Sequence, residues 1–376
     1  MHHHSDEERE LLGLVRSFAA ERVAPRAAED ERAGRFPRDL FDQLAGMDLT
    51  GLPFAPEQGG SGVPFGVYLE VVEELSRAWL AVGLTLSVHT LATWAVATFG
   101  GETVRADVLP RLVAGEWLGA YALSEPGSGS DAAALTTRAV RDGDTWRLTG
   151  TKAWVTHQGE ADCYVVMART GEPGPEGISA FLVPADAEGL SFPEREHKMG
   201  MAASPTGQLV LVEVGVPADH QLGESGDGFA TAMRALDSGR LCIAACAVGL
   251  GQAALDAARS YADERVQFGR PIADFQGVAF MLADMATGVE AARALTRSAA
   301  SLRDAGQPFG VRAAMAKLFA TDTVMRVATD AVQVHGGYGY TTDFAVERYL
   351  REAKVLQIVE GTNQVQRMVI ARALRR

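Results

Sequence analysis

Residues 121–131 read Tyr-Ala-Leu-Ser-Glu-Pro-Gly-Ser-Gly-Ser-Asp, an apolar start that runs into a glycine- and serine-rich loop. Such a loop offers bare backbone N–H groups and hydroxyls to the polar edge of a ligand, although an ordinary surface turn has the same composition. The segment lacks Gly-x-Gly-x-x-Gly and does not open a strand–helix unit, which disfavours a Rossmann-type dinucleotide site. It also marks the point at which the pattern of the chain changes.

Helical patterns lie on both sides of a β-rich stretch. Apolar spacings of three and four predict a helix over about residues 6–28 and further helices up to residue 112. Short β-type runs fill the next hundred residues, with a hairpin turn at 142–144.

Seven-residue repeats return after Gly228. Leu241 and Val248 form one such repeat and Leu318 and Met325 another, which predicts long helices with these side chains in the core of a four-helix bundle. We therefore expect an α+β, mainly α, fold with three domains: an N-terminal helical domain (1–118), a middle β-barrel-like domain (119–228) and a C-terminal helical bundle (229–376).

The composition disfavours several classes of function. A net charge of -13 over 376 residues repels phosphate backbones and anionic lipids. No apolar run in the sequence reaches the ~18 residues of a membrane span; the longest low-charge stretch covers residues 82–99. Three cysteines without a Cys-x-x-Cys pair indicate buried thiols in a reducing compartment. We expect a cytoplasmic protein with no nucleic-acid, membrane or metal partner.

Six segments in order resemble the signatures of the acyl-CoA dehydrogenase family, and the likeness covers essentially the whole chain. They are residues 121–131, Lys152–Thr156, Asp237–Arg240, Glu264–Gly269 with Gln276, Gln333–Tyr340 and Ile358–Gln364.

The resemblance implies FAD as cofactor, held by two groups of residues. Trp154 would lie beside the isoalloxazine, and Thr156 would donate its hydroxyl to flavin N5. Tyr121, Leu123 and Ser124 would meet the pyrimidine end of the ring through backbone groups. The remaining implied FAD contacts are Ser130, Thr362 and Gln364, together with a set that reaches the FAD of a neighbouring subunit: Arg265, Phe268, Gln276, Gln333, Gly336 and Gly337. A homotetramer is expected.

Glu360 is the candidate catalytic base. It follows an apolar stretch, where desolvation would raise its pKa towards neutrality, but by itself it could equally be a surface carboxylate at a helix start. The resemblance implies that Glu360 removes the α-proton of an acyl-CoA while the β-hydride passes to flavin N5, giving a trans-2-enoyl-CoA. It also implies that Ser130, Asp237, Arg240 and Gly361 contact the substrate.

Three residues depart from the family pattern. Val359 stands where many relatives carry tyrosine, and His157 where asparagine is common. Gly239 stands where some relatives carry an alternative glutamate base, which leaves Glu360 as the candidate.

Several related and unrelated functions remain open. An acyl-CoA oxidase, or a dehydrogenase whose substrate is attached to an acyl carrier protein, would look the same. A nitroalkane oxidase-like protein would use aspartate as base. A DNA-binding relative would carry a basic C-terminal region, whereas this chain is acidic. A flavin-free helical protein would be colourless. An electron-transfer flavoprotein is the expected electron acceptor.

Overall fold

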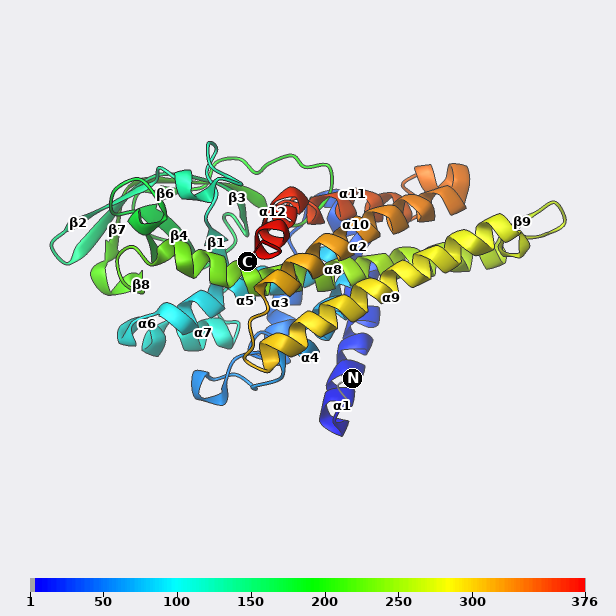
Figure 1. Cartoon of the computed structure of the whole chain (residues 1–376), viewed down its shortest axis with the longest axis horizontal. Helices are drawn as coiled ribbons and strands as arrows, with labels where there is room; N and C mark the ends of the chain where they lie inside the picture. Colours follow the sequence, from blue (N-terminus) through cyan, green and yellow to red (C-terminus); the bar gives the residue numbers. More distant parts are fainter. Residues whose placement is uncertain (1–3, 376) are drawn as a thin grey trace.

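The computed structural model describes residues 4–375, so the N-terminal histidines His2 and His3 lie outside it. Figure 1 shows an elongated molecule with the β-sheet at one end and long helices extending to the other.

Within residues 4–375, seven α-helices precede the sheet. The long helix predicted over residues 6–28 is interrupted: a π-helical turn and a 3-10 turn span residues 19–26. Pro25 lies in the second turn, and because proline has no N–H it cannot continue an α-helical hydrogen-bond ladder. The helices are α1 (Asp6–Phe18), α2 (Ala27–Ala33), α3 (Arg38–Gly46), α4 (Phe65–Ala78), α5 (Leu80–Phe99), α6 (Glu102–Asp107) and α7 (Leu109–Val113).

The middle part is one eight-stranded sheet. Its strands run in the order β6-β7-β3-β2-β4-β5-β8, and β1 pairs in parallel with β4. The predicted hairpin turn at 142–144 joins antiparallel β2 and β3, with Gly143 at φ +63°. The bounds are β1 (Gly119–Ala122), β2 (Arg138–Asp142), β3 (Thr145–Thr156), β4 (Cys163–Arg169), β5 (Ile178–Pro184), β6 (Leu190–Ser191), β7 (Thr206–Pro217) and β8 (Gln221–Leu222).

The C-terminal part is built around α8, a helix of 37 residues that packs against α4, α5, α9 and α10. A two-stranded arm, β9 with β10, joins α8 to α9 and lies at the tip opposite the sheet (Figure 1). The elements are α8 (Gly228–Glu264), β9 (Val266–Gln267), β10 (Arg270–Pro271), α9 (Gln276–Asp304), α10 (Gly310–His335), α11 (Val346–Leu356) and α12 (Asn363–Ala373).

One of the two predicted core repeats lies at the edge of the core. Leu241 and Val248 are buried in α8, as predicted, whereas Leu318 and Met325 of α10 are only half-buried and line a groove, with Met325 also packed against the core. The buried face of α10 carries mostly small side chains, such as Ala316 and Ala320. Small residues let two helices approach closely, so the larger side chains are left on the adjoining face.

Helices α5 and α8 are long and apolar enough to cross a membrane by length and composition, which the sequence reading had excluded. The most apolar window of each is largely buried inside the fold, 94% in α5 and 78% in α8. Such burial is typical of core helices, and the side chains of both contribute to the main hydrophobic cluster.

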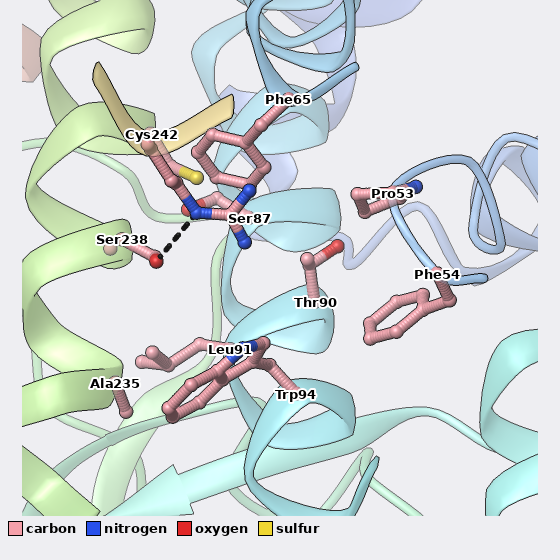
Figure 2. Close-up of a pocket in the computed structure, with 12 residues that line it drawn as sticks. Pro53, Phe54, Phe65, Ser87, Thr90, Leu91, Trp94, Ala235, Ser238 and Cys242 are labelled. Carbon is pink, nitrogen blue, oxygen red and sulfur yellow. Dashed lines mark hydrogen bonds between the residues drawn. The ribbon is translucent and has the colours of Figure 1, made fainter. Parts of the chain in front are cut away.

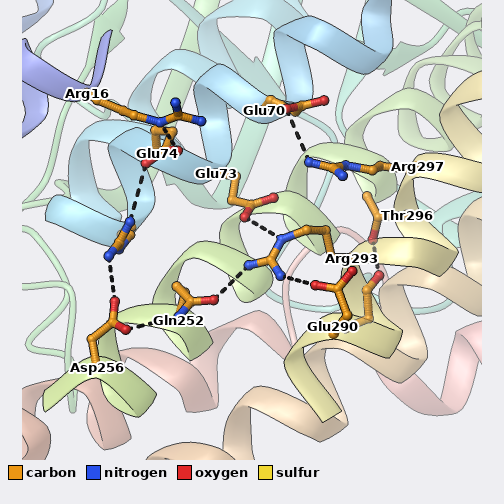
Figure 3. Close-up of polar contacts among 12 residues, drawn as sticks. Arg16, Glu70, Glu73, Glu74, Gln252, Asp256, Glu290, Arg293, Thr296 and Arg297 are labelled. Carbon is orange, nitrogen blue, oxygen red and sulfur yellow. Dashed lines mark hydrogen bonds and ion pairs between the residues drawn. The ribbon is translucent and has the colours of Figure 1, made fainter. Parts of the chain in front are cut away.

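Charged side chains join α4 to the bundle (Figure 3). Arg293 of α9 donates to Glu73 of α4 at 2.8 Å and to Gln252 of α8 at 2.9 Å. Arg297 of α9 pairs with Glu70 of α4 at 3.2 Å. This network therefore joins α4 to α8 and α9 through side chains that do not line the pocket described below.

Candidate active site

Glu360 lies in the turn between α11 and α12. Its backbone has a φ of +52°, rare for a residue other than glycine, and Gly361 follows at φ +90°. Both carboxylate oxygens are buried and have no hydrogen-bond partner among residues 4–375. Burial raises the pKa of Glu360 to about 7, against the opposing charges of Lys317 and Arg240. The turn therefore holds a carboxyl group that can gain or lose a proton near neutral pH.

Gly239 of α8 makes room for that carboxylate. A Cβ atom at this position would lie 2.0 Å from Glu360 Oε2, so any larger residue would displace the carboxylate. The glycine thus has a steric role that the sequence reading did not recognise. Tyr121 of β1 lies close enough that the Glu360 charge, after burial, contributes to raising the pKa of its phenol.

Lys317 of α10 forms hydrogen bonds with the turn that contains Glu360. Its buried Nζ donates to the carbonyl oxygen of Gly361 at 3.0 Å and to Asn363 Oδ1 at 2.8 Å. Gln366 donates to the same Gly361 carbonyl at 2.8 Å. Burial lowers the pKa of Lys317 to about 7, whereas the nearby Glu360 charge acts to raise it.

The sequence reading missed Lys317, although a signal was present. Lys317 lies among alanines that form the buried face of α10, and a lysine on such a face is rarely buried unless it has a specific partner. The partner here is the backbone of the Glu360 turn.

A buried ion pair anchors the loop of residues 121–131. Lys152 of β3 donates to Glu125 at 2.8 Å and to the Leu123 carbonyl at 3.1 Å. Glu125 also accepts from the backbone N–H groups of Thr136 and Thr137 at 2.7 and 2.8 Å. These hydrogen bonds hold the 121–131 loop in one conformation, so it is not an ordinary surface turn.

Trp154 lies on the solvent-exposed side of the 121–131 loop. The Ser124 carbonyl accepts from the N–H of Ala153 at 2.9 Å, which ties the loop to β3. A register shift in β3 between Lys152 and Val155 and a φ of +60° at Trp154 turn its ring outward, where 62% of the residue is exposed. A large exposed indole beside an ordered polar loop fits the flat ring of a flavin. Thr156 ends the same strand half-buried, and Ser130 is exposed.

An apolar pocket adjoins the carboxylate (Figure 2). Figure 2 labels ten of its lining residues, and Gly239 also lies in its wall. Since Gly239 also lies against the Glu360 carboxylate, the pocket and the carboxylate meet at this glycine. The other lining residues come from the 51–64 loop and from α4, α5, α8 and α9: Pro53, Phe54, Phe65, Ser87, Thr90, Leu91, Trp94, Ala235, Ser238, Cys242 and Arg303.

The predicted substrate contacts Asp237 and Arg240 lie on α8, on either side of Gly239 in the sequence. They form an ion pair at 2.6 Å, and Arg240 is buried with its Nε unpartnered among the described residues. Of the other predicted residues near the turn, Thr362 caps α12 by accepting from Val365 N–H at 3.3 Å, and Gln364 is exposed.

The second group of predicted FAD contacts lies elsewhere. The Arg265 guanidinium lies 5.6 Å from the centre of the Tyr338 ring, which places the β9–β10 arm beside the glycine-rich turn after α10. Phe268, at the tip, is 94% exposed. The elements that carry this cluster, which are the β9–β10 arm, the start of α9 and the end of α10, lie at the opposite end of the molecule from the sheet (Figure 1). The cluster comprises Arg265, Phe268, Gln276, Gln333, Gly336 and Gly337, and the structure does not bring it to the Glu360 site of the same chain.

Within residues 4–375, no group of three or more His, Cys, Asp or Glu side chains is arranged to hold a metal ion.

Comparison with known proteins identifies the class. The chain matches three family profiles, described as the N-terminal (residues 5–116), middle (120–214) and C-terminal (226–375) domains of acyl-CoA dehydrogenase. The chain belongs to the acyl-CoA dehydrogenase family of oxidoreductases, whose cofactor is FAD.

Individual relatives are similar over their whole length. An acyl-CoA dehydrogenase of Bacillus subtilis is 44% identical over 374 residues, 99% of each chain. The structure of butyryl-CoA dehydrogenase from Megasphaera elsdenii has a TM-score of 0.98 and 41% identity, with both chains fully covered. A structure from work on the electron transferring flavoprotein of Acidaminococcus fermentans has a TM-score of 0.98 and 42% identity, again with both chains fully covered.

Proposed function

We propose that this chain oxidises an acyl-CoA thioester between its α and β carbons, with Glu360 as the base. The observation that carries this is the Glu360 carboxylate, buried without a hydrogen-bond partner and pressed against Gly239 in the pocket wall. A carboxyl group of pKa about 7 is matched to proton abstraction at neutral pH.

Glu360 contributes both its side chain and its backbone N–H to the proposed reaction. The Glu360 carboxylate takes the α-proton, and the electrons of that C–H bond form the new C=C bond as the β-hydrogen leaves as hydride. FAD, when bound, supplies the acceptor for that hydride. The backbone N–H of Glu360 has no acceptor among the described residues and is free to bind the thioester carbonyl, stabilising the charge that develops there. The product is a trans-2-enoyl-CoA.

The residues around Trp154 fit the flavin ring, and those of the arm fit the rest of the cofactor. Backbone groups at Tyr121, Leu123 and Ser124 would hold the polar end of the ring, and Thr156 would donate to the atom that accepts the hydride. The arm cluster offers a fixed positive charge at Arg265, suited to a pyrophosphate. Because the arm projects away from its own active site, it would complete the site of a second subunit.

A homotetramer, with electron-transfer flavoprotein as acceptor, is part of the same proposal. The exposed arm supports one subunit contact. The half-buried apolar groove on α10, lined by Met315, Leu318, Phe319 and Met325, supports a second.

Anaerobic mixing of the purified yellow protein with saturated acyl-CoAs tests the activity. We expect bleaching of the flavin absorbance by at least one member of a panel of short, medium, long and branched acyl-CoAs, with the matching 2-enoyl-CoA as product. The same acyl groups on an acyl carrier protein serve as comparison. Bleaching by none of the CoA thioesters would contradict the proposal.

A further inference from the structure

One cationic side chain in the pocket has no assigned task. Arg303, the second-last residue of α9, lines the pocket together with Gly239 and Cys242. Its side chain is half-buried, and burial lowers the pKa of its guanidinium. A charge withdrawn from water normally has an opposite charge close by.

Among residues 4–375 no carboxylate forms an ion pair with Arg303 within 4.0 Å, and the charge of the adjacent Asp304 acts on the guanidinium only from a greater distance. The adjacent Asp304 is engaged elsewhere, accepting from the backbone N–H groups of Phe65 at 2.8 Å and Gly66 at 3.0 Å. The guanidinium donates through Nε to Ser238 Oγ at 3.1 Å, and its other N–H groups have no acceptor among the described residues.

The guanidinium is nevertheless held in place. Its central carbon lies 3.6 Å from the centre of the Phe65 ring, so the planar group stacks on the aromatic face. The bond to Ser238, whose hydroxyl appears in Figure 2 with this contact dashed, fixes its edge. The guanidinium is fixed on one face by stacking and on one edge by a hydrogen bond. Its remaining N–H donors are therefore pre-organised to bind a carboxylate.

Two adjacent residues of α8 connect Arg303 to the Glu360 carboxylate. Ser238 accepts a hydrogen bond from Arg303, and the next residue, Gly239, lies against the Glu360 carboxylate. Because the Cα atoms of neighbouring residues are about 3.8 Å apart, a short acyl group with its α-carbon at Glu360 would extend towards Arg303.

We propose that Arg303 is a specificity-determining residue that binds an oxygen-bearing, anionic end of the acyl group, so that the substrate is the CoA thioester of a short dicarboxylic acid. This inference rests on the proposed dehydrogenase activity. The rest of the pocket is mostly apolar, which suits the methylene groups between the two carboxyl carbons.

The test compares two substrates of the same shape. Glutaryl-CoA carries a terminal carboxylate, and 5-methylhexanoyl-CoA carries an isopropyl group in its place. Anaerobic flavin reduction is measured for the natural chain and for Arg303→Met, Arg303→Lys and Arg297→Gln. Arg297 lies on the same helix but pairs with Glu70 away from the pocket, which makes it the matched control.

We expect the natural chain to prefer glutaryl-CoA. Arg303→Met should lower the second-order rate constant of reduction for glutaryl-CoA by roughly 100-fold, because it removes one partner of a desolvated charge pair. It should leave 5-methylhexanoyl-CoA unchanged or faster. Arg303→Lys should restore part of the loss, and Arg297→Gln should change neither substrate.

Three outcomes would overturn the inference. In the first, the flavin of the natural chain is reduced only by 5-methylhexanoyl-CoA. In the second, Arg303→Met lowers the rate of flavin reduction equally for both substrates. In the third, Arg297→Gln has the same effect as Arg303→Met. Flavin content and melting temperature of each variant separate these from misfolding. If no acyl-CoA of any kind bleaches the flavin, the failure lies with the dehydrogenase activity itself.

Discussion

Replacing Glu360 with glutamine is expected to slow flavin reduction by about 10⁴-fold with every acyl-CoA, near the upper end of what a positioned general base supplies. The amide has nearly the size of the carboxylate and fits the same space against Gly239, so substrate and flavin should still bind. What it lacks is the ability to take a proton. Anaerobic stopped-flow absorbance measures the rate, and flavin content measures cofactor retention.

The stability of the same variant gives an internal control. A carboxyl whose pKa is raised by folding stabilises the fold at low pH, and that contribution is lost as pH rises through the folded value of about 7. At pH 8 the natural chain buries a charged carboxylate that has no hydrogen-bond partner. The Glu360→Gln variant buries an uncharged amide instead and avoids that cost. We therefore expect Glu360→Gln to melt no lower than the natural chain at pH 8. Glu347→Gln, which alters a half-buried ion pair with Arg351 on α11, should retain the reduction rate.

Mixed assemblies should recover activity that neither parent has. The parents are Glu360→Gln and the double variant Arg265→Glu/Phe268→Ala, each expected to be nearly inactive. If the arm of one subunit completes the site of its partner, a mixed dimer contains one site with an intact base and an intact arm. Random pairing then gives roughly a quarter of the natural activity.

Co-expression of the two variants with different affinity tags, followed by two-step purification, isolates the mixed species. Half of the sites should be intact if the isolated species is a dimer, and roughly 30% if it is a tetramer of two randomly paired dimers. Activity no higher than that of the separate parents would show that each arm serves its own chain. The tags themselves are checked on a mixed assembly of two natural chains.

The sequence pattern predicted the order of helices and strands well because each element has its own periodicity. It failed where packing between elements decides the outcome. Leu318 and Met325 repeat as a core stripe would, yet the small side chains of Ala316 and Ala320 take the buried face of α10. Pro25 interrupts a helix whose apolar spacing continues past it.

In the candidate site, too, local sequence patterns predicted some features, while packing between distant elements decided the others. The motif around Glu360 could be found from its resemblance to a family signature, and the structure places Gly361 at a positive φ directly after the acid. The contacts that set its chemistry come from residues distant in the chain: Lys317 lies 44 positions before Gly361 and reaches it only because α10 packs under the turn. Arg303 likewise meets Ser238 across 65 positions. No local pattern carries such information.

The pH dependence of anaerobic flavin reduction by the natural chain tests the role of Glu360 most directly. The second-order rate constant reports the free protein, in which the base must be deprotonated to act. We predict a rate that rises with pH through an apparent pKa near 7 and then levels off, and that this rise is absent in Glu360→Gln. A natural chain whose rate is already level from pH 5.5 upward, as an ordinary exposed glutamate of pKa ~4.3 would give, would contradict the account.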